Sequence, residues 1–125
     1  VPAGTEVLAG LEMGGIPIAT ALSLRTGIPA AFVRKEAKKY GTARLAEGAD
    51  IAGRVVTVVE DVITTGGQVL ISTDDLRSLG ALVADVICVI DRSPDGGAIL
   101  AEHGLTMHAL LTRAQLDAAE ARRLA

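Results

Sequence analysis

The sequence predicts a single α/β domain with a mostly parallel β-sheet flanked by helices. Short apolar runs rich in Val, Ile and Leu alternate with helix-like segments, and this alternation is typical of parallel sheets buried on both faces. A chain of 125 residues is long enough for one domain with a modest core. Phe32 and Tyr40 are its only aromatic residues, so we expect an aliphatic core.

The first third of the chain predicts two strands around one helix. Glu6–Leu11 is short and apolar, which indicates a strand, and Ile16–Thr26 has helical spacing. Pro17 lies in the first turn of this helix, where a missing N–H costs nothing, and Gly27 is placed to end it. Ala30–Val33 predicts the second strand.

The middle of the chain predicts a long connection followed by a strand, a helix and a strand. Arg34–Gly53 is polar, charged and interrupted by glycines, which indicates a loop. Consecutive apolar, largely β-branched residues in Arg54–Val59 predict a strand buried on both faces. Gly66–Leu79 is amphipathic and predicts a helix, and Leu82–Ile90 predicts another buried strand.

The last third predicts two further helices around a strand. Ser93 as the N-cap and Pro94 at the first helical position predict a helix that ends near Gly104. Leu105–Leu111 predicts the last strand. The spacing of Thr112–Gln115 is that of a capping box, which predicts a final helix.

Bulk properties argue against several classes of partner. The net charge of −3 and the scarcity of aromatic residues disfavour binding to nucleic acids or anionic membranes. The single cysteine, Cys88, excludes an internal disulfide and fits a reducing compartment, so we expect a cytoplasmic protein. No apolar run is long enough to span a bilayer.

The segment Val58–Gln68 combines two acids with a glycine-rich helix start. Backbone N–H groups at a helix start bind phosphate, and glycines allow close approach of the backbone. Glu60 and Asp61 would repel phosphate, but they suit vicinal ribose hydroxyls and positive charge developing on a sugar ring. The plain alternative is an ordinary strand end followed by a helix entry.

Basic residues are concentrated in one stretch of this acidic chain. Arg34, Lys35, Lys38 and Lys39 lie within six residues, and the chain has no other lysine. Such a cluster predicts an anion site, for example a basic lid that closes over an anion and neutralises it. A solvated charged loop is the alternative interpretation.

Two further strand ends carry candidate binding groups. The turn within Gly10–Pro17 offers backbone amides to anions, although it also fits a simple strand-to-helix turn. Arg92 follows a predicted strand, and its planar guanidinium suits a carboxylate, although such arginines often form surface ion pairs. His103, His108 and Cys88 show no spacing that predicts a metal site.

Two of these segments resemble a known enzyme family. Val58–Gln68 resembles the motif with which type I phosphoribosyltransferases bind phosphoribosyl pyrophosphate (PRPP). Phe32–Gly41 resembles the catalytic loop of the orotate phosphoribosyltransferases in particular, and Gly10–Pro17 resembles their pyrophosphate loop. Some members carry a lysine at the position of Gly14, so we expect this loop to act through its backbone.

The resemblance implies roles for individual residues. The catalytic residues would be Lys35, Lys38, Glu60 and Asp61. The PRPP site would comprise Arg34, Lys35, Lys38, Tyr40, Glu60, Asp61, Val62, Ile63, Thr64, Thr65, Gly66, Gly67 and Gln68. Orotate would contact Thr64 and Arg92, and the pyrophosphate loop would consist of Glu12, Met13, Gly14 and Gly15.

The resemblance also implies a reaction and an architecture. Orotate and PRPP would give orotidine 5′-monophosphate and pyrophosphate, with Mg²⁺ held mainly by the substrate and not by protein ligands. We expect a Rossmann-like core domain over 1–125 and a flexible catalytic loop at about 34–53 that is shared across a homodimer. The N-terminal hood that the family typically has either lies outside this chain or is lacking. The alternatives are a phosphoribosyltransferase for another base and a non-catalytic PRPP-binding regulator.

Overall fold

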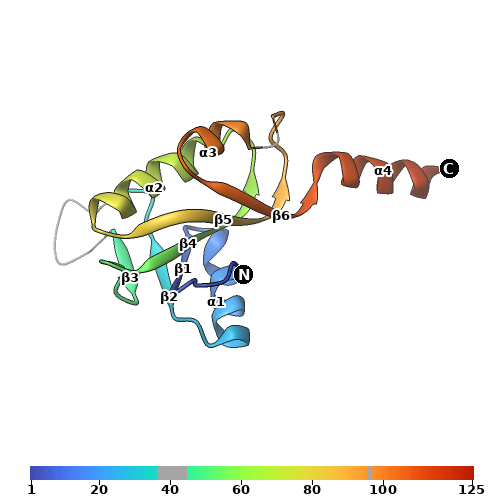
Figure 1. Ribbon diagram of the computed structural model, residues 1–125. Coiled ribbons are helices and arrows are strands. Elements are labelled where there is room, and N and C mark those ends of the chain that lie inside the picture. The colour runs from blue at the N-terminus through green and yellow to red at the C-terminus, as the bar shows by residue number, and fades with distance from the viewer. Residues whose placement is uncertain (37–44, 96) are drawn as a thin grey trace.

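The structure is a computed structural model that describes residues 1–36, 45–95 and 97–125. Six strands form one sheet in the order β3-β2-β1-β4-β5-β6, and every neighbouring pair is parallel except the antiparallel pair of β2 and β3 (Figure 1). The elements are β1 (Val7–Leu11), α1 (Gly15–Thr26), β2 (Ala30–Val33), β3 (Ala46–Gly48), β4 (Val55–Ile63), α2 (Gly67–Ser78), β5 (Leu82–Asp91), α3 (Ala98–Glu102), β6 (Thr106–Thr112) and α4 (Arg113–Leu124). The predicted α/β fold with a mostly parallel sheet is therefore confirmed.

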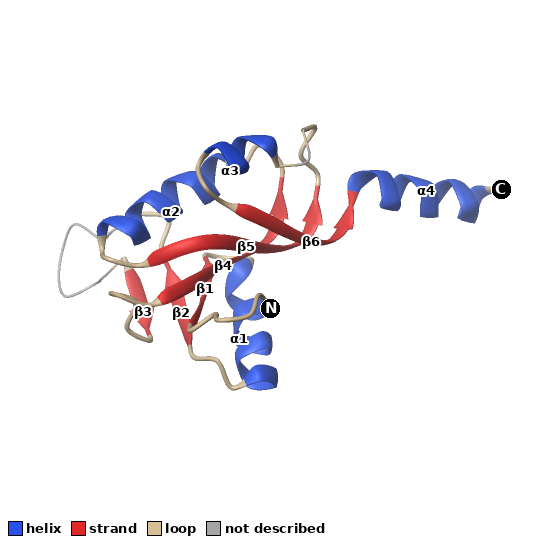
Figure 2. Ribbon diagram, in the orientation of Figure 1, coloured by secondary structure: helices blue, strands red, loops and turns tan. Residues whose placement is uncertain are grey.

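Helices α1, α2 and α3 cover the sheet from both sides. Helix α1 lies on one face, and α2 and α3 lie on the other (Figure 2). The core between these layers is aliphatic, as predicted, with the central strands β1 and β4 contributing many of its fully buried side chains. Cys88 belongs to this core, and burial raises the pKa of its thiol to about 11, so the thiol remains protonated.

The structure corrects three of the predicted element boundaries. Strand β4 runs on to Ile63 because its pairing with β5 continues to the end, so Glu60 and Asp61 lie within the strand. The connection 34–53 contains the short strand β3, which pairs with β2. Helix α3 does not start at Ser93, because the Ser93 amide donates to the carboxylate of buried Asp91 and its hydroxyl also contacts that group.

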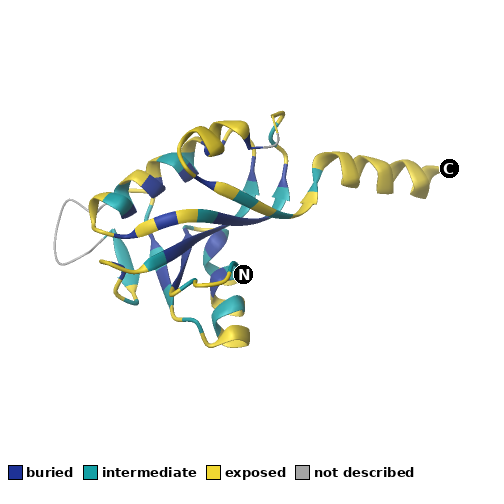
Figure 3. Ribbon diagram, in the orientation of Figure 1, coloured by how far each residue is buried: buried dark blue, intermediate teal, exposed yellow. Residues whose placement is uncertain are grey.

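Helix α4 is specified by its own sequence. The predicted capping box is present, since the Gln115 amide donates to Thr112 Oγ1 at 3.2 Å and the Thr112 amide donates to Gln115 Oε1 at 2.9 Å. Helix α4 projects away from the sheet and has no buried residue (Figure 3). In the described part of the chain, no helix is both long and apolar enough to cross a membrane.

Candidate active site

The candidate residues converge where the strand order reverses. The chain proceeds outward from β1 through β2 to β3, and then from β4 through β5 to β6 on the other side. The carboxyl ends of β1 and β4 therefore flank a topological switch point, where open α/β sheets bind ligands. An open hollow of about 550 Å³ lies at this edge and is lined by Glu12, Arg34, Lys35, Glu36, Gln68 and Ile71.

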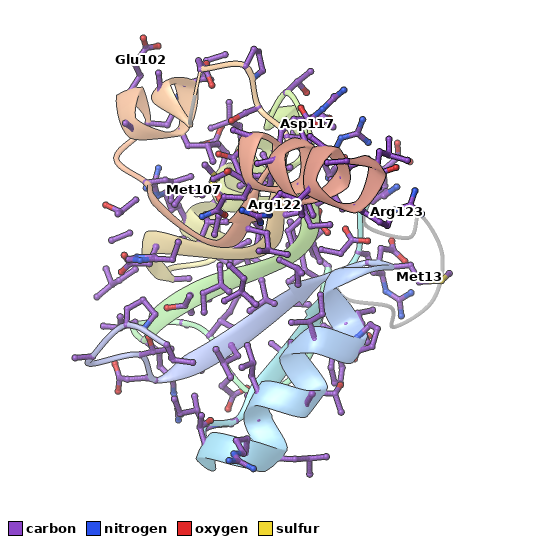
Figure 4. All side chains as sticks on the ribbon, turned by 90° about the vertical axis from the view of Figure 1, so that its right-hand side faces the viewer. Met13, Glu102, Met107, Asp117, Arg122 and Arg123 are labelled. Atoms are coloured by element: carbon purple, nitrogen blue, oxygen red, sulfur yellow. The ribbon has the colours of Figure 1, made fainter. Side chains whose placement is uncertain are left out.

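The turn Glu12–Gly15 packs directly against β4. A Cβ atom added to Gly15 would overlap the carbonyl oxygen of Val59, and one added to Gly14 would overlap the carboxylate of Asp61. Gly15 therefore has to be glycine for the turn to lie this close to the strand, because its neighbour is backbone, whereas a side chain at position 14 would require the Asp61 carboxylate to move. The Met13 side chain is 80% exposed and points away from the body of the molecule (Figure 4). The backbone of this turn at Gly14 and Gly15 therefore lies against β4.

The two acids are half-buried and are oriented by backbone amides. The amide of Asp61 donates to Glu60 Oε1 at 3.0 Å, and the amide of Val62 donates to Asp61 Oδ1 at 2.7 Å. The second carboxylate oxygen of Asp61, Oδ2, lies over Gly14. The Asp61 carboxylate thus lies against the turn that follows β1.

Burial makes the Glu60 carboxyl a weaker acid than usual. The pKa of Glu60 is raised from 4.5 to about 7, mainly because burial disfavours the charged carboxylate; contact with Asp61 also raises it. The hydrogen bond from the Asp61 amide and the charge of Lys35 act in the opposite direction.

The raised pKa predicts a pH-dependent stability. A carboxyl whose folded pKa of about 7 exceeds its unfolded value of 4.5 contributes stability below pH 4.5 that is lost as the pH rises to about 7. Glu60→Gln removes this titration. Relative to wild type, the variant should therefore gain free energy of unfolding as the pH rises from 4.5 to about 7. Urea unfolding of both proteins across that range measures the difference, and parallel pH curves would contradict the prediction.

The segment after β4 forms a turn suited to an anion. Thr64 and Thr65 are exposed, and Gly66 adopts a left-handed conformation with φ +83° before α2 begins. The Gly67 amide donates to Thr65 Oγ1 at 3.3 Å. Within the described ranges of the chain, the amides of Thr64, Thr65 and Gly66 have no protein acceptor. They are therefore available to a phosphate group.

The basic segment is described only at its beginning. The Arg34 amide donates to the carbonyl of Leu45 at 2.8 Å, and its guanidinium lies 3.7 Å from Glu47 Oε1 on β3. Sequence analysis missed Glu47, because nothing in the polar connection signals that it pairs with β2. The predicted site residues Lys38 and Tyr40 lie outside the described residues.

Arg92 lies beside the end of β4. Ile63 pairs with Asp91, so Thr64 and Arg92 follow neighbouring strand ends, and the Arg92 amide donates to the Ile63 carbonyl at 2.8 Å. Arg92 is exposed, which leaves its guanidinium accessible to a ligand.

Two other predicted site residues have contacts within the protein. The Ile63 side chain belongs to the core, and the Gln68 side chain donates to Ser72 Oγ at 3.0 Å.

The sequence profile of the phosphoribosyl transferase domain matches residues 2–108. The chain belongs to the phosphoribosyl transferase domain family. It is 59% identical over 119 residues to an orotate phosphoribosyltransferase of Nocardioides sp., which covers 95% of this chain and 66% of that protein. It is 45% identical over 113 residues to the orotate phosphoribosyltransferase of Halobacterium salinarum, covering 90% of this chain and 65% of the relative.

Solved structures of this phosphoribosyl transferase family agree with the fold. A phosphoribosyltransferase from Corynebacterium diphtheriae superposes with a TM-score of 0.81 at 37% identity, covering 90% of this chain and 67% of that structure. The Mycobacterium tuberculosis orotate phosphoribosyltransferase in complex with PRPP superposes with a TM-score of 0.76 at 38% identity, covering 90% of this chain and 65% of that structure. The chain thus spans about 65% of the curated relatives named above.

Proposed function

We propose that this chain is the catalytic core of an orotate phosphoribosyltransferase, which converts orotate and PRPP to orotidine 5′-monophosphate and pyrophosphate. One observation carries the proposal: the Glu12–Gly15 turn contacts both Asp61 on β4 and the backbone of Lys35 after β2. Acids suited to ribose and a cation suited to pyrophosphate therefore meet around one turn. The identity to relatives named for this activity supports orotate as the base.

The proposed chemistry is a glycosyl transfer at the anomeric carbon. The bond from this carbon to pyrophosphate breaks, pyrophosphate leaves with the electron pair, and a ring nitrogen of orotate forms the new bond. Asp61 and Glu60 face the ribose and stabilise its positive charge, while Arg34 and Lys35 neutralise the departing pyrophosphate. The amides of Thr64–Gly66 hold the 5′-phosphate, and Arg92 binds the carboxylate of orotate.

In the proposed reaction Mg²⁺ would be held mainly by the substrate. The described residues include no cluster of three His, Cys, Asp or Glu side chains that could hold a metal. Mg²⁺ retains water and phosphate oxygens readily, so most of its ligands would come from pyrophosphate and ribose. Asp61 and Glu60 are the protein groups placed to contact its hydration shell, and the ion would neutralise charge on pyrophosphate.

A comparison of bases tests the proposed function. Purified protein is assayed for pyrophosphate release from PRPP with orotate, uracil, adenine or hypoxanthine as acceptor. The expected result is rapid release with orotate alone. Preference for another base would identify a different phosphoribosyltransferase. Tight PRPP binding in calorimetry without pyrophosphate release with any base would instead identify a regulator.

The resemblance of the basic loop also motivates a shared site in a homodimer. Lys38→Ala disables the loop and Arg92→Ala disables the core, so a mixed dimer regains one intact site if the loop crosses to the partner. An equimolar random mixture should then recover about a quarter of wild-type activity. The control mixes Arg92→Ala with Asp61→Asn, two core defects, and should recover nothing. A Lys38→Ala and Arg92→Ala mixture as inactive as its parents would refute the shared site.

A further inference from the structure

The side chain of Glu12 occupies an unexpected place for an acid. Glu12 belongs to the turn expected to hold pyrophosphate, where a carboxylate would repel the ligand. It lines the open hollow together with Arg34 and Lys35. An acid at this position therefore needs a partner that explains its presence.

That partner is the backbone of Lys35. The Lys35 amide donates to Glu12 Oε1 at 2.6 Å, and the Glu12 amide itself donates to the Val33 carbonyl at 2.9 Å. Glu12 thus extends the pairing of β1 and β2 past both strand ends, first with its backbone and then with its carboxylate. Hydrogen bonds to a charged acceptor are shorter and stronger than neutral ones.

The opposite side of the same segment is held by β3. The Arg34 amide donates to the Leu45 carbonyl, and the Arg34 guanidinium approaches Glu47. The chain at Arg34 and Lys35 is therefore held between Glu12 on one side and the β3 region on the other. This arrangement sets where the Lys35 side chain starts, beside the open hollow that Lys35 lines.

We propose that Glu12 is a positioning residue, whose carboxylate holds the Lys35 backbone so that the lysine side chain meets pyrophosphate. This inference rests on the proposed function, because it assigns Lys35 to the departing group. Glu12 acts through its acceptor oxygen and not through contact with substrate. Position 12 therefore requires a side chain that is long enough to bring an acceptor oxygen to the Lys35 amide. The negative charge of that side chain is secondary.

Two substitutions at Glu12 separate the acceptor from the charge. Glu12→Gln keeps an oxygen at the same distance from Lys35, whereas Glu12→Ala removes it. We expect kcat for pyrophosphate release to fall about tenfold or more in Glu12→Ala, because small misplacements of catalytic groups are costly. In Glu12→Gln we expect a loss of about threefold or less, since a neutral hydrogen bond remains. Equal losses in both variants, or none in Glu12→Ala, would overturn the proposal.

A matched control exists at the other end of the same strand. Glu6 Oε1 accepts the Val55 amide at 3.0 Å, so Glu6 links β1 to β4 as Glu12 links β1 to the segment after β2. Glu6→Ala removes an equivalent contact far from the site. It should lower the melting temperature about as much as Glu12→Ala while leaving kcat unchanged. A fall in kcat with Glu6→Ala as large as with Glu12→Ala would show a merely structural effect.

Two readouts separate this inference from the proposed function. Amide hydrogen exchange at Lys35 should accelerate in Glu12→Ala but not in Glu12→Gln, whatever reaction the protein catalyses. In a Lys35→Ala background, Glu12→Ala should reduce kcat little further, because the two residues act as one unit. Unchanged exchange, or fully additive losses, would overturn the role of Glu12. Absence of turnover with orotate in wild type would instead refute the function and leave the exchange result valid.

Discussion

Asp61→Asn is expected to reduce turnover of PRPP about a hundredfold or more, in line with the loss of a preorganised charge from an active site. The asparagine keeps an oxygen for the Val62 amide, which donates to Asp61 Oδ1 at 2.7 Å, so the local backbone should persist. The variant loses the negative charge that faces the developing cation. Steady-state kinetics with circular dichroism as a folding check measures the effect.

The control for Asp61→Asn is Asp74→Asn, which changes an exposed acid on α2 and should leave turnover intact. Wild-type activity in Asp61→Asn would remove the ribose role from this residue. A loss of folded structure in Asp61→Asn would instead assign Asp61 a structural role. We do not expect this, because asparagine can still accept the hydrogen bond from the Val62 amide.

Gly15→Ala is expected to destabilise the protein by about 2–3 kcal/mol, the upper range for overpacking a tight contact. The added Cβ would overlap the Val59 carbonyl oxygen, which is backbone and cannot rotate away. The start of α1 would have to move from β4, and the Glu12–Gly15 turn would move with it. Urea unfolding measures the stability, and calorimetry with PRPP measures the accompanying loss of affinity.

Gly67→Ala provides the stability control for this prediction. An added Cβ at Gly67 would lie 3.5 Å from Thr65 Oγ1, an ordinary contact, and alanine favours the first turn of α2. The urea concentration at the midpoint of unfolding should be the same for this variant as for wild type, or slightly higher. If Gly15→Ala unfolds at the same concentration as Gly67→Ala, the turn does not depend on close contact with β4.

Local patterns predicted most of the elements because they depend on neighbours in sequence. Apolar runs indicated the buried parallel strands, and the spacing of Thr112 and Gln115 indicated the capping box that begins α4. The prediction for Ser93 and Pro94 was wrong because buried Asp91 competes for the groups that an N-cap would use. That competition depends on burial, which the local pattern does not contain.

The sequence alone determined the α/β class, the aliphatic core and the residue types at the site, because periodicity and composition are local properties. Only the tertiary structure decided that Glu60 and Asp61 lie inside a strand, since β4 extends as far as β5 offers hydrogen-bond partners. It also decided that Gly14 and Gly15 contact β4 and that Glu12 holds Lys35, 23 residues away. Such contacts arise from the order of strands in the sheet, and residue spacing along the chain carries no record of that order.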